Sequence, residues 1–89
     1  MLGRNEGQGE LTERIAAIAG RLMGELGLPG QPRLDAPLGE GGLGFDSMGK
    51  LDLLAAVEKE CAVAIPEKYW GPRQLKNLAD LARVAVRRR

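Results

Sequence analysis

The sequence predicts a small all-α fold: a four-helix bundle of three main helices and one short helix, with a long loop between the first two. Apolar residues recur at helical spacing in three segments, and no segment alternates apolar and polar residues as a half-buried strand does. Pro and Gly separate these segments from one another. With 89 residues, 44% of them hydrophobic, the chain has the size and composition of one small globular domain.

The first helix is expected from about Glu10 to Leu26, because its apolar residues fall on one face of a helical wheel. Those residues are Leu11, Ile15, Ile18, Ala19, Leu22 and Leu26. Gly27, with a proline shortly after it, is a typical helix end. Residues 1–9 are polar and rich in glycine, so we expect a disordered N-terminal segment ahead of a domain over residues 10–86.

A long loop is expected over residues 29–46. It is rich in Pro and Gly and has no periodic pattern, and loops of this length are uncommon unless they are functional or disordered. We expect some of its apolar side chains to pin it onto the helices; the candidates are Leu34, Leu38, Leu43 and Phe45.

Three more elements are predicted after the loop. They are a second helix from Asp46 to about Cys61, a short turn or helix over residues 66–71, and a last helix from about Gln74 to Val86, followed by a basic tail over residues 87–89. Asp46 is a strong N-cap residue, and Pro66 suits the first position of a helix. The arginine tail is typical of a solvated helix end.

The second helix has two apolar faces. One stripe should face the core: Leu53, Leu54, Val57 and Cys61. A second patch, on the other side, consists of Met48, Leu51 and Ala55, with the charged residues Asp52, Glu58 and Lys59 at its border. Folding needs only one apolar face, so the second is either a docking surface or a surface that the long loop covers.

Composition excludes several kinds of chemistry. The chain has no histidine and one cysteine, so it holds no Ser-His-Asp or Cys-His pair, no His-based or multi-Cys zinc site and no internal disulfide. No apolar run is long enough for a membrane span or a signal peptide, so we expect a cytoplasmic protein. The net charge of +1 gives little reason to expect a nucleic acid as partner.

Ser47 follows the expected cap residue Asp46. A serine at a helix start is usually a capping residue, and the local pattern favours that interpretation. However, Asp46 already occupies the cap position, and a helix N-terminus favours an anion such as a phosphate ester. The residues around Ser47 therefore leave two interpretations.

The segment around Ser47 resembles the LG-x-DS-[LM] signature of acyl and peptidyl carrier proteins; it reads Leu43-Gly44-Phe45-Asp46-Ser47-Met48. The order of elements is also similar over about residues 10–86. The resemblance implies that a phosphopantetheinyl transferase attaches 4′-phosphopantetheine from coenzyme A to Ser47, and that the arm carries a thioester-linked intermediate. It also implies that the chain is not an enzyme and that Cys61 is not the reactive thiol.

The same resemblance assigns further positions. Asp46 and Leu75 border the arm, and partner enzymes dock on the second helix at Met48, Leu51, Asp52, Ala55 and Glu58. These partners are an acyl- or aminoacyl-loading enzyme and downstream synthase or tailoring enzymes, with the carrier itself a monomer.

Departures from the family narrow the expected role. Lys50 and Lys59 lie among the acids of the second helix, and Gly49 stands where the fatty-acid type usually has an acid. Because partner choice depends on charge complementarity, we expect a stand-alone carrier in polyketide or nonribosomal peptide biosynthesis. Local similarity to D-alanyl carrier proteins, including a counterpart of Trp70, supports teichoic acid modification as an alternative. An unmodified helical adaptor is an alternative of another class.

Overall fold

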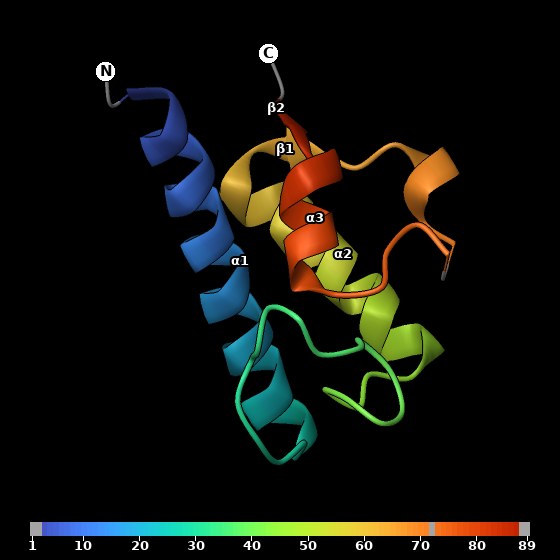
Figure 1. Ribbon diagram of the computed structural model, residues 1–89. Coiled ribbons are helices and arrows are strands. Elements are labelled where there is room, and N and C mark those ends of the chain that lie inside the picture. The colour runs from blue at the N-terminus through green and yellow to red at the C-terminus, as the bar shows by residue number, and fades with distance from the viewer. Residues whose placement is uncertain (1–2, 72, 88–89) are drawn as a thin grey trace.

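The computed structural model describes residues 3–71 and 73–87, with side chains from Gly9 onward (Figure 1). Its elements are helices α1 (Gly3–Leu26), α2 (Ser47–Cys61) and α3 (Leu78–Val84), the 3₁₀ turn η1 (Glu67–Tyr69), and strands β1 (Val63–Ala64) and β2 (Val86–Arg87). The predicted helical class is confirmed. Within the described residues the bundle has three α-helices, because the expected short helix is a single 3₁₀ turn.

Helix α1 packs along α2 and α3 (Figure 1). Its core residues are Ile15, Ile18, Ala19 and Met23. It ends at Leu26 with Gly27 in the left-handed region (φ 73°), as predicted. None of the helices in the described part of the chain is long and apolar enough to cross a membrane.

The start of α1 differs from the prediction. The helix begins at Gly3, whereas a disordered segment was expected over residues 1–9 and a helix only from about Glu10. Gly9 and Glu10 are exposed, so the apolar period begins only where α1 reaches the core at Leu11. A helical end that does not face the core carries no such period. Residues 1 and 2 lie outside the described residues.

The long loop crosses the end of the bundle where α1 ends and α2 begins (Figure 1). Leu38, Leu43 and Phe45 are buried and pin it to the core as predicted, whereas Leu34 is 40% exposed. The loop closes on itself through hydrogen bonds from Leu43 N–H to the Pro37 carbonyl (2.8 Å) and from Phe45 N–H to the Leu38 carbonyl (2.9 Å).

Two contacts make the loop a fixed part of the fold. A Cβ at Gly42 would lie 2.0 Å from the Pro37 carbonyl oxygen, so only glycine fits there. The Leu38 N–H donates to the Lys76 carbonyl (3.0 Å), which ties the loop to the segment before α3. The loop therefore holds one conformation at the N-terminal end of α2.

The last helix is shorter than predicted. The prediction began it near Gln74, but Asn77 has an extended backbone and its side chain accepts a hydrogen bond from Asp80 N–H (2.9 Å), so α3 starts at Leu78. The Asp80 carboxylate accepts in turn from Lys76 N–H (2.9 Å). Apolar periodicity continues past both ends of α3, so only the caps mark its limits.

A small antiparallel sheet replaces the expected end of the last helix. Ala85 is extended, and Val86 then pairs with Ala64 and Arg87 with Val63. Two-residue strands are too short to produce an alternating pattern, so the sequence did not reveal them. The sheet lies at the end of the bundle opposite the long loop (Figure 1).

Candidate functional site

The candidate site is the first turn of α2. Asp46 occupies the N-cap, with extended backbone angles (φ −84°, ψ −172°), and its Oδ1 accepts a hydrogen bond from Gly49 N–H at 2.7 Å. Ser47 is the first residue of the helix and is exposed. The interpretation of Ser47 as the capping serine is therefore wrong, because Asp46 performs that role and leaves the Ser47 hydroxyl outside it.

Gly49 allows this turn to pack closely against the rest of the fold. A Cβ at Gly49 would lie 3.1 Å from Asp46 Oδ1, 3.2 Å from Phe45 Cδ1 and 3.6 Å from Leu26 Cδ1. Gly49 is buried, so it lies outside the surface that a partner could touch. Its lack of an acidic side chain consequently has a packing reason and says nothing about partner charge, contrary to the argument from sequence.

An apolar cavity of about 340 Å³ opens beside Ser47. Its lining residues come from the loop, from α2 and from the segment before α3: Leu38, Ser47, Lys50, Leu51, Leu53, Leu54, Trp70 and Leu75. Leu75, which the resemblance places beside the arm, is buried and lines the same cavity as Ser47. The Trp70 indole N–H donates to the Ile65 carbonyl (2.7 Å), which fixes the ring that forms one wall.

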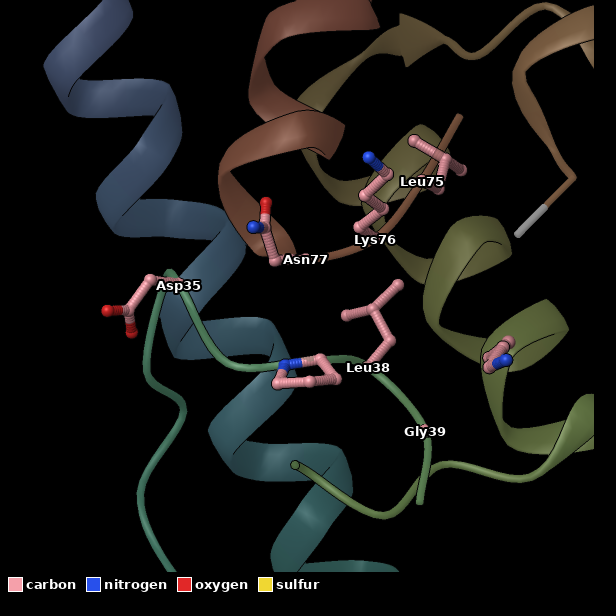
Figure 2. Close-up of a pocket in the computed structure, with 8 residues that line it drawn as sticks. Asp35, Leu38, Gly39, Leu75, Lys76 and Asn77 are labelled. Carbon is pink, nitrogen blue, oxygen red and sulfur yellow. The ribbon is translucent and has the colours of Figure 1, made fainter. Parts of the chain in front are cut away.

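A second cavity, of about 490 Å³, adjoins the first, because both are lined by Leu38, Lys50 and Leu75. In Figure 2, Leu38 projects from the loop toward the segment that carries Leu75 and Lys76. The remaining lining residues are Asp35, Pro37, Gly39 and Asn77. The two cavities lie side by side along the contact between the loop, α2 and the segment before α3.

The second apolar face of α2 is open. Met48 is 71% and Leu51 50% exposed, and Ala55 and the neighbouring Asp52 are exposed as well. The alternative that the long loop covers this patch is therefore wrong. The loop instead packs on the other side of the first turn, where Phe45 contacts Gly49.

Glu58 differs from the other predicted docking residues. It is half-buried, and its Oε2 accepts a hydrogen bond from Ile65 N–H at 2.7 Å. Its backbone carbonyl also accepts from the left-handed cap residue Ala62. Glu58 thus holds the chain that leaves α2, in addition to bordering the open face.

Sequence reasoning missed part of the cavity wall. Leu38 was expected to pin the loop and Trp70 was interpreted mainly as a packing residue, yet both line the cavity beside Ser47. Leu38 and Trp70 lie outside α2, so a helical wheel of α2 could not place them beside Ser47. Lys50 could have been found, because a residue three positions after Ser47 lies on the same side of a helix.

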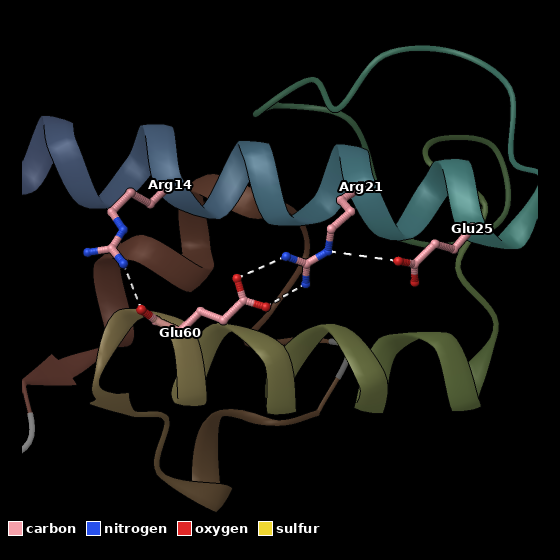
Figure 3. Close-up of polar contacts among 4 residues, drawn as sticks. All are labelled: Arg14, Arg21, Glu25 and Glu60. Carbon is pink, nitrogen blue, oxygen red and sulfur yellow. Dashed lines mark hydrogen bonds and ion pairs between the residues drawn. The ribbon is translucent and has the colours of Figure 1, made fainter.

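The C-terminal end of α2 carries an ion-pair cluster (Figure 3). Arg21 donates to both carboxylate oxygens of Glu60, with an Nη1–Oε1 distance of 2.9 Å, and Arg14 donates to the Glu60 carbonyl at 2.7 Å. The hydrogen bond from Arg21 lowers the pKa of Glu60, and the same bond raises the pKa of Arg21. This cluster links α1 to α2, and its residues Arg14, Arg21 and Glu60 line a further cavity of about 340 Å³.

Cys61 stands beside that cluster and is half-buried against the core. Burial raises the pKa of its thiol, so the nucleophilic thiolate is disfavoured. The placement agrees with the predicted core stripe, whose other members, Leu53, Leu54 and Val57, are buried.

Comparisons of the chain with protein-family models, with curated proteins and with solved structures find no match. The case for a function accordingly rests on the motif that contains Ser47 and on the geometry around it. That geometry combines an exposed hydroxyl, a cap made by another residue and an adjoining apolar cavity.

Proposed function

We propose that this chain is a carrier protein whose Ser47 bears a 4′-phosphopantetheine arm donated by coenzyme A. The observation that carries the proposal is the position of Ser47. The residue is exposed, Asp46 caps the helix in its place, and Ser47 lines an apolar cavity of about 340 Å³. If Ser47 served only as a helix cap, Asp46 would not be needed in that role and no cavity would be expected beside Ser47.

The attachment step balances without any catalytic group on this chain. The Ser47 Oγ forms a bond to the phosphorus of coenzyme A that bears pantetheine, and the bond from that phosphorus to adenosine 3′,5′-bisphosphate breaks. The hydroxyl proton passes to a base on the transferase. Asp46 is held by Gly49 N–H (2.7 Å), so its contribution is to keep the hydroxyl at a fixed, accessible place.

The residues around Ser47 fit such a group. A phosphodiester at the first helical residue lies near the positive end of the helix dipole, which favours an anion by roughly 0.3–1 kcal/mol at an exposed site. Leu51, Trp70 and Leu75 offer apolar walls next to it. When attached, the arm supplies a thiol that holds an acyl or aminoacyl group as a thioester.

The open face of α2 supports docking of partner enzymes. Met48, Leu51 and Ala55 form an exposed apolar patch, and Asp52 beside them is an exposed charge that can select partners. Lys59 is exposed on the same helix. This mixed charge supports a role in polyketide or nonribosomal peptide biosynthesis over one in fatty-acid synthesis.

Intact mass spectrometry tests the modification. The protein is incubated with coenzyme A and a broad-specificity phosphopantetheinyl transferase, and a gain of one phosphopantetheinyl group is expected. Ser47 is the single serine of the chain, so Ser47→Ala should abolish the gain and Thr12→Ala should keep it. No gain in the parent protein, or a gain that survives Ser47→Ala, contradicts the proposal.

Two further assays separate the alternatives. Loading of the modified protein by a D-alanine ligase, beside a panel of other amino and carboxylic acids, distinguishes teichoic acid modification from natural-product biosynthesis. In a cell that depends on this protein, an unmodified adaptor predicts that Ser47→Ala keeps full function while Leu51→Asp abolishes it. The carrier proposal expects both variants to lose function.

A further inference from the structure

Lys50 lies one helical turn after Ser47, and both line the cavity of about 340 Å³. They are its only polar lining residues beside the Trp70 indole, among leucines of the loop, of α2 and of the segment before α3. Lys50 also lines the adjoining cavity of about 490 Å³. Lys50 thus borders both cavities, and Ser47, the proposed modification site, borders the first of them.

Lys50 is a half-buried residue whose ammonium group has no carboxylate partner among the described residues. Its Nζ lies 3.4 Å from the position that a Cβ on Gly39 would occupy. The Lys50 side chain therefore extends over the loop at Gly39, which has no side chain of its own. The ion pairs among the described residues are Arg21 with Glu25 and Glu60, Arg33 with Asp35, and Arg83 with Asp80, and none includes Lys50. An ammonium group without an ion-pair partner attracts an anion that is placed near it.

The other charged groups near this position do not supply that anion. Asp46 directs Oδ1 to Gly49 N–H, and Asp35, on the wall of the second cavity, pairs with Arg33 at 3.7 Å. Lys76, on the same wall, adds a second positive charge. The charged residues that line the two cavities are therefore Lys50, Lys76 and Asp35, an excess of one positive charge.

We propose that Lys50 is the counter-ion of a phosphate ester on Ser47 and positions that group at the mouth of the cavity. This inference rests on the proposed modification of Ser47 and adds a residue to it. The ammonium pairs with the ester oxygens, which turns the first atoms of the attached group toward the apolar walls. In this proposal the main effect of Lys50 is to bind the phosphate ester, and repulsion of positively charged partner proteins is secondary.

The test uses two sources of the same phosphate chemistry. In the first arm, phosphoserine is incorporated genetically at position 47, and the second ionisation of its phosphate is followed by ³¹P NMR against pH. The pKa of an ordinary phosphoserine is about 6. We expect a value lower by about 0.5 in the protein with Lys50, because a nearby cation favours the dianion.

Variants decide whether Lys50 is responsible. Lys50→Met and Lys50→Gln should restore the ordinary phosphate pKa, and Lys50→Arg should keep the lowered one. Lys59→Met, which removes an exposed charge from the same helix, should leave the lowered value unchanged. An unchanged pKa in Lys50→Met, or an equal rise in Lys76→Met, overturns the assignment.

In the second arm, the phosphopantetheinyl form is made with the transferase. At low salt, attachment should raise the melting temperature by about 2–5 °C in the parent protein and by much less in Lys50→Met. Equal gains in both proteins contradict the proposal. If the transferase fails to modify Ser47, the proposed function fails, while the phosphoserine arm still decides the role of Lys50.

Discussion

The two ends of α2 use charge in opposite ways. At the C-terminal end, Arg14, Arg21 and Glu60 satisfy one another across the contact with α1. At the N-terminal end, Ser47 is exposed and Lys50 is half-buried without an acidic partner among the described residues. One helix thus has an end where charged side chains pair across the fold and an end where the Ser47 and Lys50 side chains make no such pair within the described part of the chain.

The difference teaches how a small domain can leave a hydroxyl exposed at a helix start while other residues stabilise that end. The Asp46 side chain caps the N-terminal end and Phe45 is buried beside it, so neither contact uses the Ser47 side chain. At the other end, side-chain ion pairs do the anchoring. Four predictions test this contrast.

The largest effect is expected from placing a charge on the core face of α2. Val57→Asp should unfold the domain, because Val57 is 0% exposed and an unpaired buried charge costs several kcal/mol. A domain of this size has a stability of only about 4–13 kcal/mol. Leu51→Asp, on the open face, should leave the melting temperature nearly unchanged in a circular dichroism melt. A drop of many degrees in Leu51→Asp would mean that the open face belongs to the core.

The second effect concerns the close approach at Gly49. Gly49→Glu should reduce the free energy of unfolding by about 1–3 kcal/mol, because the new side chain meets Phe45 and Asp46. The matched control is Gly24→Glu on α1, where a Cβ meets nothing within 4 Å and the helix gains up to about 1 kcal/mol. Urea titration measures both. Equal stability of the two variants would place Gly49 on the surface after all.

The third effect separates the cap from the candidate nucleophile. Asp46→Ala should cost about 0.5–2 kcal/mol in denaturant unfolding, because the hydrogen bond to Gly49 N–H is lost. Ser47→Ala should change stability by less than about 0.5 kcal/mol, as expected for an exposed residue outside the cap. If Ser47→Ala is as destabilising as Asp46→Ala, the serine shares the capping role.

The smallest effect is expected from the ion pair at the other end of α2. The pKa of Glu60 is lowered in the folded protein, so its stabilising contribution is present above the ordinary carboxyl pKa of about 4.3 and is lost as the pH falls through the lower folded value. The melting temperature of Glu60→Gln should lie slightly below that of the parent at neutral pH and converge with it in acid. Because the pair is exposed, salt near 1 M should remove the gap. A gap that persists at acid pH would show that packing, rather than charge, holds α1 to α2.

Much of this arrangement could be predicted because it depends on local patterns. Apolar spacing located α1 and α2, and the cap at Asp46 and the end at Gly27 were both recognised from residue type. The two faces of α2 also followed from the wheel. The limits of α3 did not, since the apolar pattern runs past the cap at Asn77 and into β2.

The candidate site divides in the same way. The sequence by itself determined that Ser47 follows a cap residue at the start of a helix with two apolar faces, because those properties depend on neighbours within a few positions. Only the tertiary structure decided that the second face is open, that Gly49 is buried, and that Leu38, Lys50, Trp70 and Leu75 meet beside Ser47. The physical reason is that these contacts join a loop, a helix and a segment far along the chain, and their formation depends on backbone hydrogen bonds such as that from Leu38 to Lys76, which no local pattern encodes.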